Sequence, residues 1–564
     1  MRYDFALIHA PSVYDFRERD DVLFAYLSNS DSVHVSPIFE MPPVGIFALE
    51  QHAKKLGHRA RFFNVASRML RDAEFDVERF FRSLDAAVIG FDLHWLVHAH
   101  GSLALAELCK LLRPDVKTVF GGISSTYFHE ELIRYDAVDY VIRGYDTLLP
   151  VERLLASRGD PEELARVPNL TFKRDGAPVV NPLSHVPRVY SAAVDWSEIF
   201  SDRRSTMTPY NLVIPQAGCE YNCRWCGGSR HFFARYMGLE GGVARVHKSP
   251  EALATELASV ARSAKGRHTL TMIDFWHEYP ELFRAAEDVF VDSNVACVHF
   301  SLHRLPKVEH AARMGAHVQA VLELSPDSHD MEVARASGRG HYSMEQMEAF
   351  IDALIGRVHS FEIYFMIGLP KQTAENVLET VEYCEHLLEK YRGKAVTPYV
   401  CPMLPFLDPG SEIADEPDKH GYRRIHRTLE EHRRALTSLN WRDRLNYETR
   451  WMSRQELVDV SYEAVRRLTL AKEKHGLLPS AFAVAIRDLI DETRGLLAEI
   501  DAFQALPDGP AKDAAAPSIR VKIRDYNRRQ LASVRSQQRP IDLGFARRQW
   551  FDTDEAIDEV LGGT

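Results

Sequence analysis

The chain has 564 residues, 45% hydrophobic and 26% charged, a composition typical of globular proteins with more than one domain. It carries 69 Lys and Arg against 80 Asp and Glu, and the resulting net charge of −11 argues against a broad nucleic-acid-binding surface. Seven cysteines in so long a chain exclude a secreted disulfide framework, and no segment has the roughly 20 apolar residues needed to span a bilayer. The sequence therefore predicts a cytoplasmic protein without a membrane span.

Residues 1–155 alternate short apolar segments with amphipathic ones. We expect strands at DFALIHAP, ARFFNV, AAVIGFD, KTVFGG and DYVIRG, with helices between them. Five strands separated by helices predict an α/β fold, a doubly wound parallel sheet of the Rossmann type whose ligand site lies at the carboxyl ends of the strands. Glycines in the turns GGISS and RGYDT would let the backbone approach a large ligand closely.

The rest of the chain divides into four further parts. Residues 156–205 are a connector with an expected hairpin at LTFKRDGAPVV. Residues 206–415 contain six strand–helix units, with strands at YNLVIPQ, TLTMIDF, VACVHFSL, HVQAVLEL, FEIYFMIGLP and AVTPYVCP, and predict a partial (β/α)6 barrel with its site at the strand carboxyl ends. Residues 416–506 are expected to form a mostly α-helical region, and residues 507–564 a linker followed by an Arg-rich tail.

Three of the seven cysteines lie within eight positions, in QAGCEYNCRWCGGSR, directly after a predicted strand. They are Cys219, Cys223 and Cys226. A structural zinc site requires four ligands, and the one nearby candidate for the fourth is His231. Three thiolates instead fit an iron–sulfur cube with one iron left open for a substrate or cofactor.

At these residues the sequence resembles the radical S-adenosylmethionine (SAM) enzymes, in which an aromatic residue precedes the last cysteine, as Trp225 does here. The resemblance implies that Cys219, Cys223 and Cys226 hold a [4Fe–4S] cluster. It also implies that the amino and carboxylate groups of SAM chelate the open iron, and that an electron from the cluster releases a 5′-deoxyadenosyl radical. An external one-electron reductant such as flavodoxin or ferredoxin would supply that electron.

The same resemblance assigns roles to residues of the later strands. In FMIGLPKQTAENV, Gly368 and Pro370 would shape the turn beside the adenosine of SAM. Glu323 would be the carboxylate that contacts the nucleoside, and Arg339 a further SAM contact. The alternatives are an ordinary strand–turn–helix segment for the glycine and proline, and a solvated strand end for Glu323.

One segment departs from the family pattern. Many members have a Gly-Gly-Glu run after the second barrel strand that holds the SAM amino group, whereas this chain has MIDFWHEYP. Asp274 and Glu278 are the candidates for binding that ammonium group. No catalytic side chain is assigned from the sequence.

The N-terminal segment resembles the cobalamin-binding domain of the cobalamin-dependent radical SAM family, in AAVIGFDLHWLVHAHG, VFGGISSTYFHEELI and VDYVIRGYDTLLP. Together with LDPGSEI, the likeness covers roughly residues 1–415. It implies that the following residues face the corrin or its nucleotide tail: Gly121, Gly122, Ser124 and Ser125, with Gly144 nearby. The alternative is a generic nucleotide-type sheet whose glycines serve the turns alone.

A histidine ligand to cobalt is not expected. The loop after the first strand, HAPSVYDFRERDD, lacks the D-x-H-x-x-G motif that supplies such a histidine in many cobalamin proteins. In DLHWLVHAHG, Val97 occupies the glycine position, so its histidines are interpreted as helix-start and loop residues. A methylthiotransferase is excluded because that class needs three further N-terminal cysteines, and this segment has Cys109 alone.

The resemblance implies a class B methyltransferase, which methylates an unactivated carbon of a small-molecule or natural-product substrate through methylcobalamin and a 5′-deoxyadenosyl radical. One alternative is a radical rearrangement or cyclisation without methyl transfer, and another is a cobalamin-binding sensor or carrier with an inactive barrel. The C-terminal helices would cap the barrel. The arginines of the tail would contact an anionic substrate or carrier protein, or form a solvated basic face: Arg520, Arg524, Arg528 and Arg529.

Overall fold

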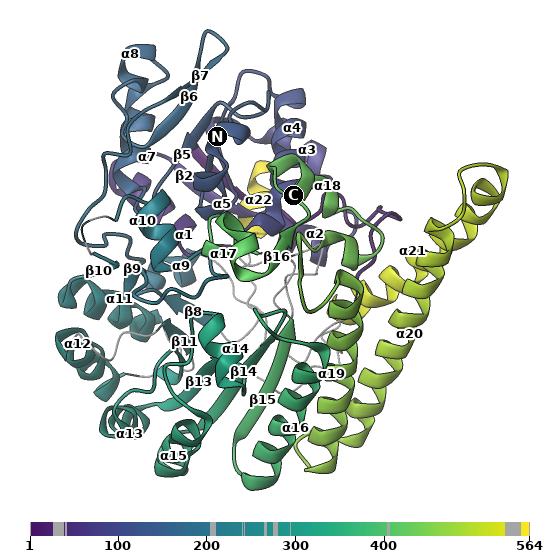
Figure 1. Ribbon diagram of the computed structural model, residues 1–564. Helices are drawn as coiled ribbons and strands as arrows, with labels where there is room; N and C mark the ends of the chain where they lie inside the picture. Colours follow the sequence, from purple (N-terminus) through teal and green to yellow (C-terminus); the bar gives the residue numbers. More distant parts are fainter. Residues whose placement is uncertain are drawn as a thin grey trace.

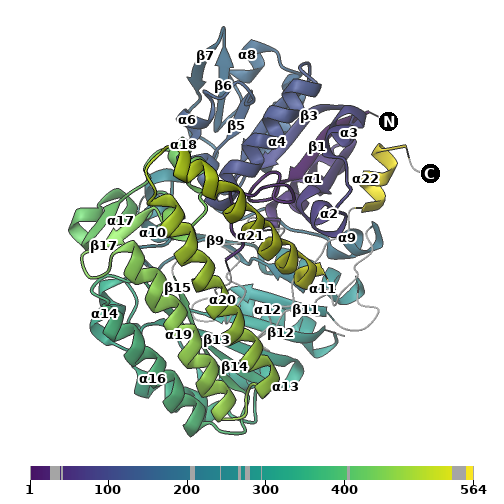
Figure 2. The same ribbon diagram turned by 90° about the vertical axis from the view of Figure 1, so that its right-hand side faces the viewer.

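The computed structural model describes residues 2–25, 39, 42–202, 210–239, 241, 243–263, 268–273, 280–293, 295–402, 407–535 and 554–562. Two large sheets organise the chain, one in the N-terminal third and one in the middle (Figure 1). The C-terminal helices pack along the side of both parts (Figure 2).

The N-terminal sheet has seven strands in the order β2-β1-β3-β4-β5-β6-β7. The bounds are β1 Tyr3–His9, β2 Ala60–Asn64, β3 Ala86–Asp92, β4 Lys117–Gly121, β5 Tyr140–Ile142, β6 Leu170–Arg174 and β7 Ala177–Val180. The first five are parallel, as predicted. The hairpin expected in the connector is present as β6 and β7, and it extends this sheet by two antiparallel strands.

Helices cover both faces of the N-terminal sheet, which makes it doubly wound. On one face Phe5 and Leu7 pack with α1 (Gly45–Lys55) and α7 (Leu148–Ser157). On the other, Ala6 and Ile8 pack with α3 (Val77–Ser83) and α4 (Ala99–Leu112). The remaining helical segments of this part are α2 Val65–Arg71, η2 Leu96–His98, α5 Ile123–Tyr127, α6 His129–Leu132 and α8 Pro161–Leu164.

The second sheet has six strands in the order β15-β14-β13-β12-β11-β8, all parallel, as predicted for the barrel. The bounds are β8 Tyr210–Val213, β11 His268–Ile273, β12 Val295–Leu302, β13 Gln319–Asp327, β14 Ser360–Ile367 and β15 Val396–Pro402. Helix α9 (Trp196–Asp202) precedes β8, and between the strands lie α10 Arg230–Tyr236, α11 Pro250–Ser263, α12 Pro280–Val291, α13 Val308–His317, α14 Met331–Ala336, α15 Met344–Leu354 and α16 Ala374–Lys390. A small antiparallel pair, β9 (Gln216–Gly218) and β10 (Arg245–His247), precedes and follows α10.

Side chains alternate sharply across this second sheet. Residues such as Phe300, Leu322 and Ile363 point to the helix-covered face and belong to the main hydrophobic core. Their neighbours in sequence, His299 and Glu323 among them, point to the opposite face, here named the inner face, because successive strand residues alternate. The inner face is thus rich in polar groups.

The C-terminal region contains α17 Glu412–Asp415, η3 Pro417–His420, α18 Leu429–Ala435, η4 Trp441–Arg444, α19 Arg454–Lys474, α20 Ser480–Gln504, α21 Pro510–Arg535 and α22 Asp554–Val560. It also has a short antiparallel pair, β16 (Tyr422–Arg424) and β17 (Tyr447–Thr449). The part 507–564, expected to begin with a linker, is helical from Pro510 onward, because α21 begins there and runs through Pro517. Proline lacks only one backbone donor, and the long flanking apolar face of α21 holds the helix together.

Helices α19, α20 and α21 lie side by side (Figure 2). Three of the four tail arginines pair with carboxylates of this chain: Arg524 with Asp20 at 2.6 Å, Arg528 with Asp525 at 3.1 Å and Arg529 with Glu492 at 2.5 Å. These pairs favour a structural face over a site for an anionic ligand. Among the residues that the structure describes, every helix is too short or too polar to cross a bilayer.

Candidate functional site

The three cysteines occupy the loop between β9 and α10. All three lie outside any disulfide; Cys223 is buried, and Cys219 and Cys226 are half-buried. Two hydrogen bonds turn the loop back on itself, from Cys226 N–H to the Cys223 carbonyl (3.1 Å) and from Gly228 N–H to Cys226 Sγ (3.2 Å). The loop ends at Ser229, whose hydroxyl caps α10 by accepting from Phe232 N–H.

Segments distant in sequence clamp this cysteine loop. The backbone N–H of Arg224 donates to the Ser337 carbonyl (2.8 Å), and its carbonyl accepts from Ile413 N–H (2.8 Å). Gly338 has φ +90°, and a Cβ there would lie 2.2 Å from the Asn222 carbonyl oxygen, so glycine is needed for the close approach. The loop is therefore positioned by residues 337–340 and by the LDPGSEI segment together.

Two buried aspartates that the sequence analysis missed also hold the loop. Asp408, in LDPGSEI, accepts from Gly227 N–H through Oδ2 (2.8 Å), and burial raises its pKa to about 6. Asp327, at the end of β13, accepts from Trp225 Nε1–H (3.3 Å), and burial raises its pKa as well. Both follow predicted strands by a few residues, which is the one signal the sequence offered.

The electrostatics of the loop fit an iron–sulfur cluster. Burial raises the pKa of the Cys223 thiol to about 12 and that of Cys226 well above its ordinary value, so bare thiolates are disfavoured and a bound metal would have to stabilise them. The buried Arg339 guanidinium lies 3.4 Å from Asp327 Oδ2. Although burial alone would lower its pKa, Asp327 and the two cysteines raise it, which keeps a cation beside the sulfur ligands.

The zinc alternative loses its fourth ligand in the structure. Nε2 of His231 lies 2.9 Å from Asp415 Oδ2, and Tyr236 Oη–H donates to the same carboxylate (2.9 Å). The imidazole Nε2 is thus paired with Asp415 and not available to a metal, which leaves the three thiols as the predicted donor set of the loop. Three thiols and a buried cation suit an anionic cube with one open corner.

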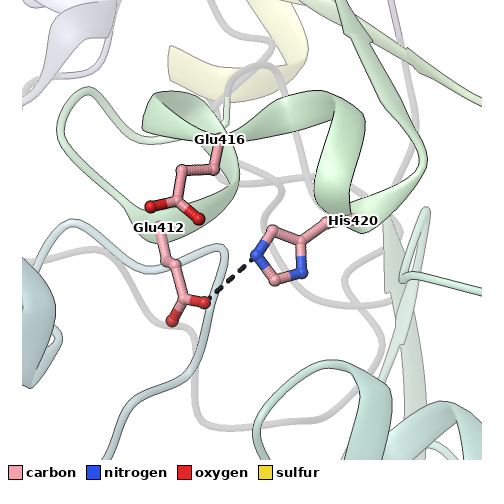
Figure 3. A group of neighbouring side chains, drawn as sticks. All are labelled: Glu412, Glu416 and His420. Atoms are coloured by element: carbon pink, nitrogen blue, oxygen red, sulfur yellow. Dashed lines mark ion pairs between the residues drawn. The ribbon is translucent and has the colours of Figure 1, made fainter.

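A second group of possible metal ligands lies next to the loop. Glu412, Glu416 and His420 converge at the end of LDPGSEI (Figure 3). The ammonium of Lys419 already lies 3.5 Å from Glu412 Oε1 and 2.6 Å from Glu416 Oε2. Glu412 Oε2 also accepts from the side chain of Asn222 in the cysteine loop (2.5 Å). The group therefore has its own cation and serves to hold the loop.

The glycine–proline turn after β14 is stabilised by hydrogen bonds from one side chain of the same turn, that of Gln372. The side-chain oxygen of Gln372 accepts from Gly368 N–H (2.8 Å) and Leu369 N–H (3.2 Å), and its amide donates to the Met366 carbonyl (2.9 Å). Gly368 has φ +97°, and a Cβ there would lie 2.5 Å from the Tyr447 hydroxyl. Gly368 and Pro370 are both buried. Their predicted role is therefore to shape the turn beside the adenosine.

Glu323 lies on the inner face at the middle of β13, one strand away from the Gly368 turn. Its Oε1 accepts from Ser301 Oγ–H (2.8 Å), and its side chain is 22% exposed, so it is not the solvated strand end of the alternative. The two candidates for the SAM ammonium, Asp274 and Glu278, lie outside the described residues.

The predicted cobalamin contacts after β4 divide into two groups. The Ser124 hydroxyl donates to the His94 carbonyl (3.2 Å) and that of Ser125 to the Gly121 carbonyl (3.1 Å), and both serines are buried. A Cβ on Gly122, at φ +117°, would lie 2.4 Å from His94 Cα. Gly121 instead has open space beside it. Gly121 is thus the part of this turn that has room for a large ligand beside it, whereas Gly122 packs against the backbone of His94.

Gly144, after β5, faces the hairpin instead of open space. Its N–H donates to Thr126 Oγ1 (3.1 Å), and at φ +105° an added Cβ would lie 3.1 Å from the Asn169 amide nitrogen. The histidines of DLHWLVHAHG lie in the loop and at the start of α4, as interpreted from the sequence: His94 is in the loop and His98 ends η2, directly before α4. Burial lowers the pKa of His94 and of His98 to about 4. His98 Nε2 contacts the Phe39 carbonyl (3.1 Å).

The ligand edges of the two sheets meet at α10. Tyr127, in the helix that follows Gly122, contacts Tyr236 at 5.1 Å between ring centroids, and Tyr145, next to Gly144, contacts Phe233 at 5.9 Å. A Cβ on Gly410 of LDPGSEI would lie 2.6 Å from the Phe232 ring and 3.0 Å from that of Tyr127. The turns after β4 and β5 are therefore packed against the helix that begins where the cysteine loop ends.

Comparison with known families agrees with this arrangement. A model of the B12-binding domain matches residues 33–152, and a model of the radical SAM superfamily matches residues 213–384. The first covers β2 to β5 with the turns at Gly121 and Gly144, and the second begins just before the cysteine loop.

Two curated proteins show similarity in sequence. The anaerobic magnesium-protoporphyrin IX monomethyl ester cyclase of Synechocystis sp. is 25% identical over 276 residues, which are 46% of this chain and 50% of the relative. An uncharacterized methyltransferase of Pyrococcus horikoshii is 21% identical over 206 residues, 35% of this chain and 43% of the relative. The chain thus spans about half the length of the curated relatives it matches.

Two solved structures share the fold. The radical SAM methyltransferase TsrM of Kitasatospora setae, with cobalamin and a [4Fe–4S] cluster bound, has a TM-score of 0.55 at 13% identity and covers 88% of this chain and 100% of its own. The cobalamin-dependent SAM radical enzyme OxsB, with aqua-cobalamin and SAM bound, has a TM-score of 0.54 at 12% identity and covers 99% and 78%. The chain therefore contains a B12-binding domain followed by a radical SAM domain, and the cofactors of these domains are cobalamin, a [4Fe–4S] cluster and SAM.

Proposed function

We propose that this enzyme methylates an unactivated carbon of a small-molecule or natural-product substrate. The observation that carries the proposal is the packing of the β4 and β5 turns against α10, which brings the cobalamin edge of one sheet beside the cysteine loop of the other. When bound, cobalamin would supply a transferable methyl group and the cluster with SAM a radical that removes hydrogen from carbon. The methyl group and the radical must both react at one carbon atom, so methyl transfer requires that the two cofactor sites be adjacent.

Residues of both domains would hold the two cofactors. Cys219, Cys223 and Cys226 would hold the cluster, with Arg339 offsetting its negative charge. The backbone at Gly121 would support the corrin. The substrate is small, and an external reductant of the flavodoxin or ferredoxin type supplies electrons.

The proposal is tested with anaerobically reconstituted protein, a chemical or flavodoxin reductant, and SAM carrying a deuterated methyl group. We expect both S-adenosylhomocysteine and 5′-deoxyadenosine to form, because methyl donation and reductive cleavage use separate SAM molecules. With small-molecule extracts added, labelled methyl groups should appear on a carbon of one product. Mass spectrometry measures all three.

Alanine at Cys219, Cys223 and Cys226 should abolish 5′-deoxyadenosine formation and reduce bound iron to background. Cys384→Ala is the matched control, since that cysteine is buried in α16 and should leave both unchanged. An unaltered 5′-deoxyadenosine yield in the triple variant would refute the cysteine assignment.

The alternative of cyclisation or rearrangement without methyl transfer keeps one specific support, the similarity to a protein named as a cyclase. It predicts 5′-deoxyadenosine and a modified product without S-adenosylhomocysteine or deuterium. The same labelled reaction therefore separates the two functions.

A further inference from the structure

One C-terminal segment contacts all three places where the cofactors are expected to bind. This segment, residues 422–449, is here named the bracket, and it comprises β16, α18, η4 and β17. Strands β16 and β17 pair with each other, so the two ends of the bracket lie together. Helix α18, between them in sequence, lies beside α4 of the N-terminal part (Figure 2). The bracket therefore spans from the C-terminal region to the cobalamin domain.

On the cobalamin side, α18 is fixed to the segment that follows β4. The Leu429 N–H at the start of α18 donates to Glu131 Oε2 of α6 (2.8 Å). The His432 ring packs on that of Phe128, with 5.9 Å between the ring centroids. Phe128 ends the short helix α5 that follows the turn at Gly121. Helix α18 is thus joined to the turn that has room for the corrin.

On the cysteine side, the bracket holds the LDPGSEI segment from both ends. The Asn446 side chain makes two hydrogen bonds with the backbone of Leu407: its Oδ1 accepts from the N–H (2.8 Å), and its Nδ2–H donates to the carbonyl (3.0 Å). Just past the other end, the Arg424 guanidinium donates to the Ala414 carbonyl (2.9 Å). The residues between these two points bind the cysteine loop, so the bracket fixes the support of that loop.

On the SAM side, the same pair of strands holds the turn after β14. The Tyr422 Oη–H donates to the Gly368 carbonyl (2.6 Å). Tyr447, next to Asn446 in sequence, has its hydroxyl 2.5 Å from the place of a Cβ on Gly368. Both tyrosines are buried. The bracket therefore also fixes the turn that is expected beside the adenosine.

The Asn446 amide has one orientation that satisfies its neighbours. Nδ1 of His432 faces the Thr428 carbonyl (2.7 Å) and so carries the ring proton, and burial lowers the pKa of His432 to about 3, which keeps the ring neutral. Its Nε2 therefore accepts from Asn446 Nδ2–H (3.1 Å). A flipped amide would place a donor against Leu407 N–H and an acceptor against the ring nitrogen. Asn446 thus locks α18 to LDPGSEI in a defined geometry.

We propose that the bracket sets the spacing of the cobalamin, cluster and SAM sites, with Asn446 as its central positioning residue. The bracket lies outside both matched domains, between which it forms a bridge. This inference rests on the proposed function, since methyl transfer is what requires the sites to be adjacent. The chain of contacts from the cobalamin domain to the cysteine loop runs through Phe128, His432, Asn446, Leu407, Asp408 and Gly227.

The test is amide hydrogen exchange of the full chain with its cluster reconstituted, followed in peptides that contain Gly227 or Leu407. We expect Asn446→Ala to speed exchange in both peptides at least about fivefold, because the loss of buried hydrogen bonds permits local opening. Asn440→Ala is the matched control. Asn440 is an equally buried residue of the bracket whose amide donates to Asp501 of α20 (2.9 Å), so both peptides should exchange as in wild type.

A second measurement separates positioning from general stability. In the reaction with labelled SAM, Asn446→Ala should lower the amount of labelled product per 5′-deoxyadenosine at least about tenfold, because a misplacement of about 1 Å costs this order of rate or more. A variant that merely contains less folded protein lowers both products alike. A wild-type ratio in Asn446→Ala would therefore count against a positioning role and overturn the inference.

Wild-type exchange in Asn446→Ala, or equal acceleration in Asn446→Ala and Asn440→Ala, would also overturn it. If Asn446→Ala does not fold, Asn446→Asp decides, since it keeps the size of the side chain and the acceptor for Leu407 N–H but loses both donated bonds. Exchange at Gly227 should then still be faster, and a wild-type rate there would overturn the inference. Hydrogen exchange needs no turnover. Local acceleration in a protein that transfers no methyl group would refute the proposed function and leave the role of Asn446 intact.

Discussion

Gly338 shows how closely single residues determine the geometry of the cysteine loop. It combines φ +90° with a distance that leaves no room for a side chain against Asn222. The sequence analysis singled out its neighbour Arg339 and missed the glycine, because the clash depends on a contact across more than a hundred residues. A backbone contact of this kind has no local signal.

Gly338→Ala should therefore displace the cysteine loop. We expect bound iron and sulfide per chain to fall at least twofold and the protein to lose about 1–3 kcal/mol of stability from backbone strain. Gly476→Ala is the matched control, since Gly476 has φ +78° but open space where a Cβ would stand. Iron assays and thermal unfolding of both variants measure the difference, and equal iron loading would contradict the assigned role of Gly338.

At the scale of elements, the sequence predicted where the strands lie better than which strands pair in a sheet. All six barrel strands and all five parallel N-terminal strands are confirmed, because buried parallel strands are short apolar segments between helices. Membership of the hairpin in the N-terminal sheet was not predictable, since pairing depends on tertiary contacts. The contacts of His299 with Glu323 and Glu362 on the inner face had a signal in the alternation of VACVHFSL and FEIYFMIG, but only strand register brings these three residues together.

The loop between β3 and α4 should make stability depend on pH. His94 and His98 are neutral in the fold, with pKa values lowered by burial from 6.5 to about 4. Between these values the unfolded chain binds protons that the folded chain does not, so the free energy of unfolding should fall as the pH drops from 6.5 to 4. Urea unfolding at a series of pH values measures the slope.

His94→Gln should reduce that slope, whereas His386→Gln, at an exposed position on α16, should leave it unchanged. A slope that is the same in wild type and His94→Gln would mean that this loop does not titrate as described.

At the scale of the whole molecule, the C-terminal region joins the two sheets. The side chain of Asn527 on α21 accepts from Phe24 N–H (3.0 Å) and donates to the Val22 carbonyl (2.7 Å) in the N-terminal part. Arg433 pairs with Glu107 at 2.6 Å, and Asp554 of α22 lies 2.9 Å from Arg71. Sequence patterns identified these segments as helical, but the contacts that seat them on the N-terminal part are not visible in a linear pattern.

Asn527→Ala should loosen this connection, because it leaves a buried N–H and a buried carbonyl without their partner. We expect a loss of about 1–3 kcal/mol in the free energy of unfolding. Arg528→Ala, which removes an exposed side chain paired with Asp525, is the control and should have little effect. Chemical unfolding followed by circular dichroism measures both, and equal stabilities would show that α21 does not hold the N-terminal part.

The clamp around the cysteines also dictates when the metal can be loaded in the cell. Ile413 and Asp408 are made long after Cys226, so the loop lacks these two hydrogen-bond partners until they arrive. Iron delivery should thus follow synthesis of the barrel, and nascent chains released before residue 407 should fail to acquire colour.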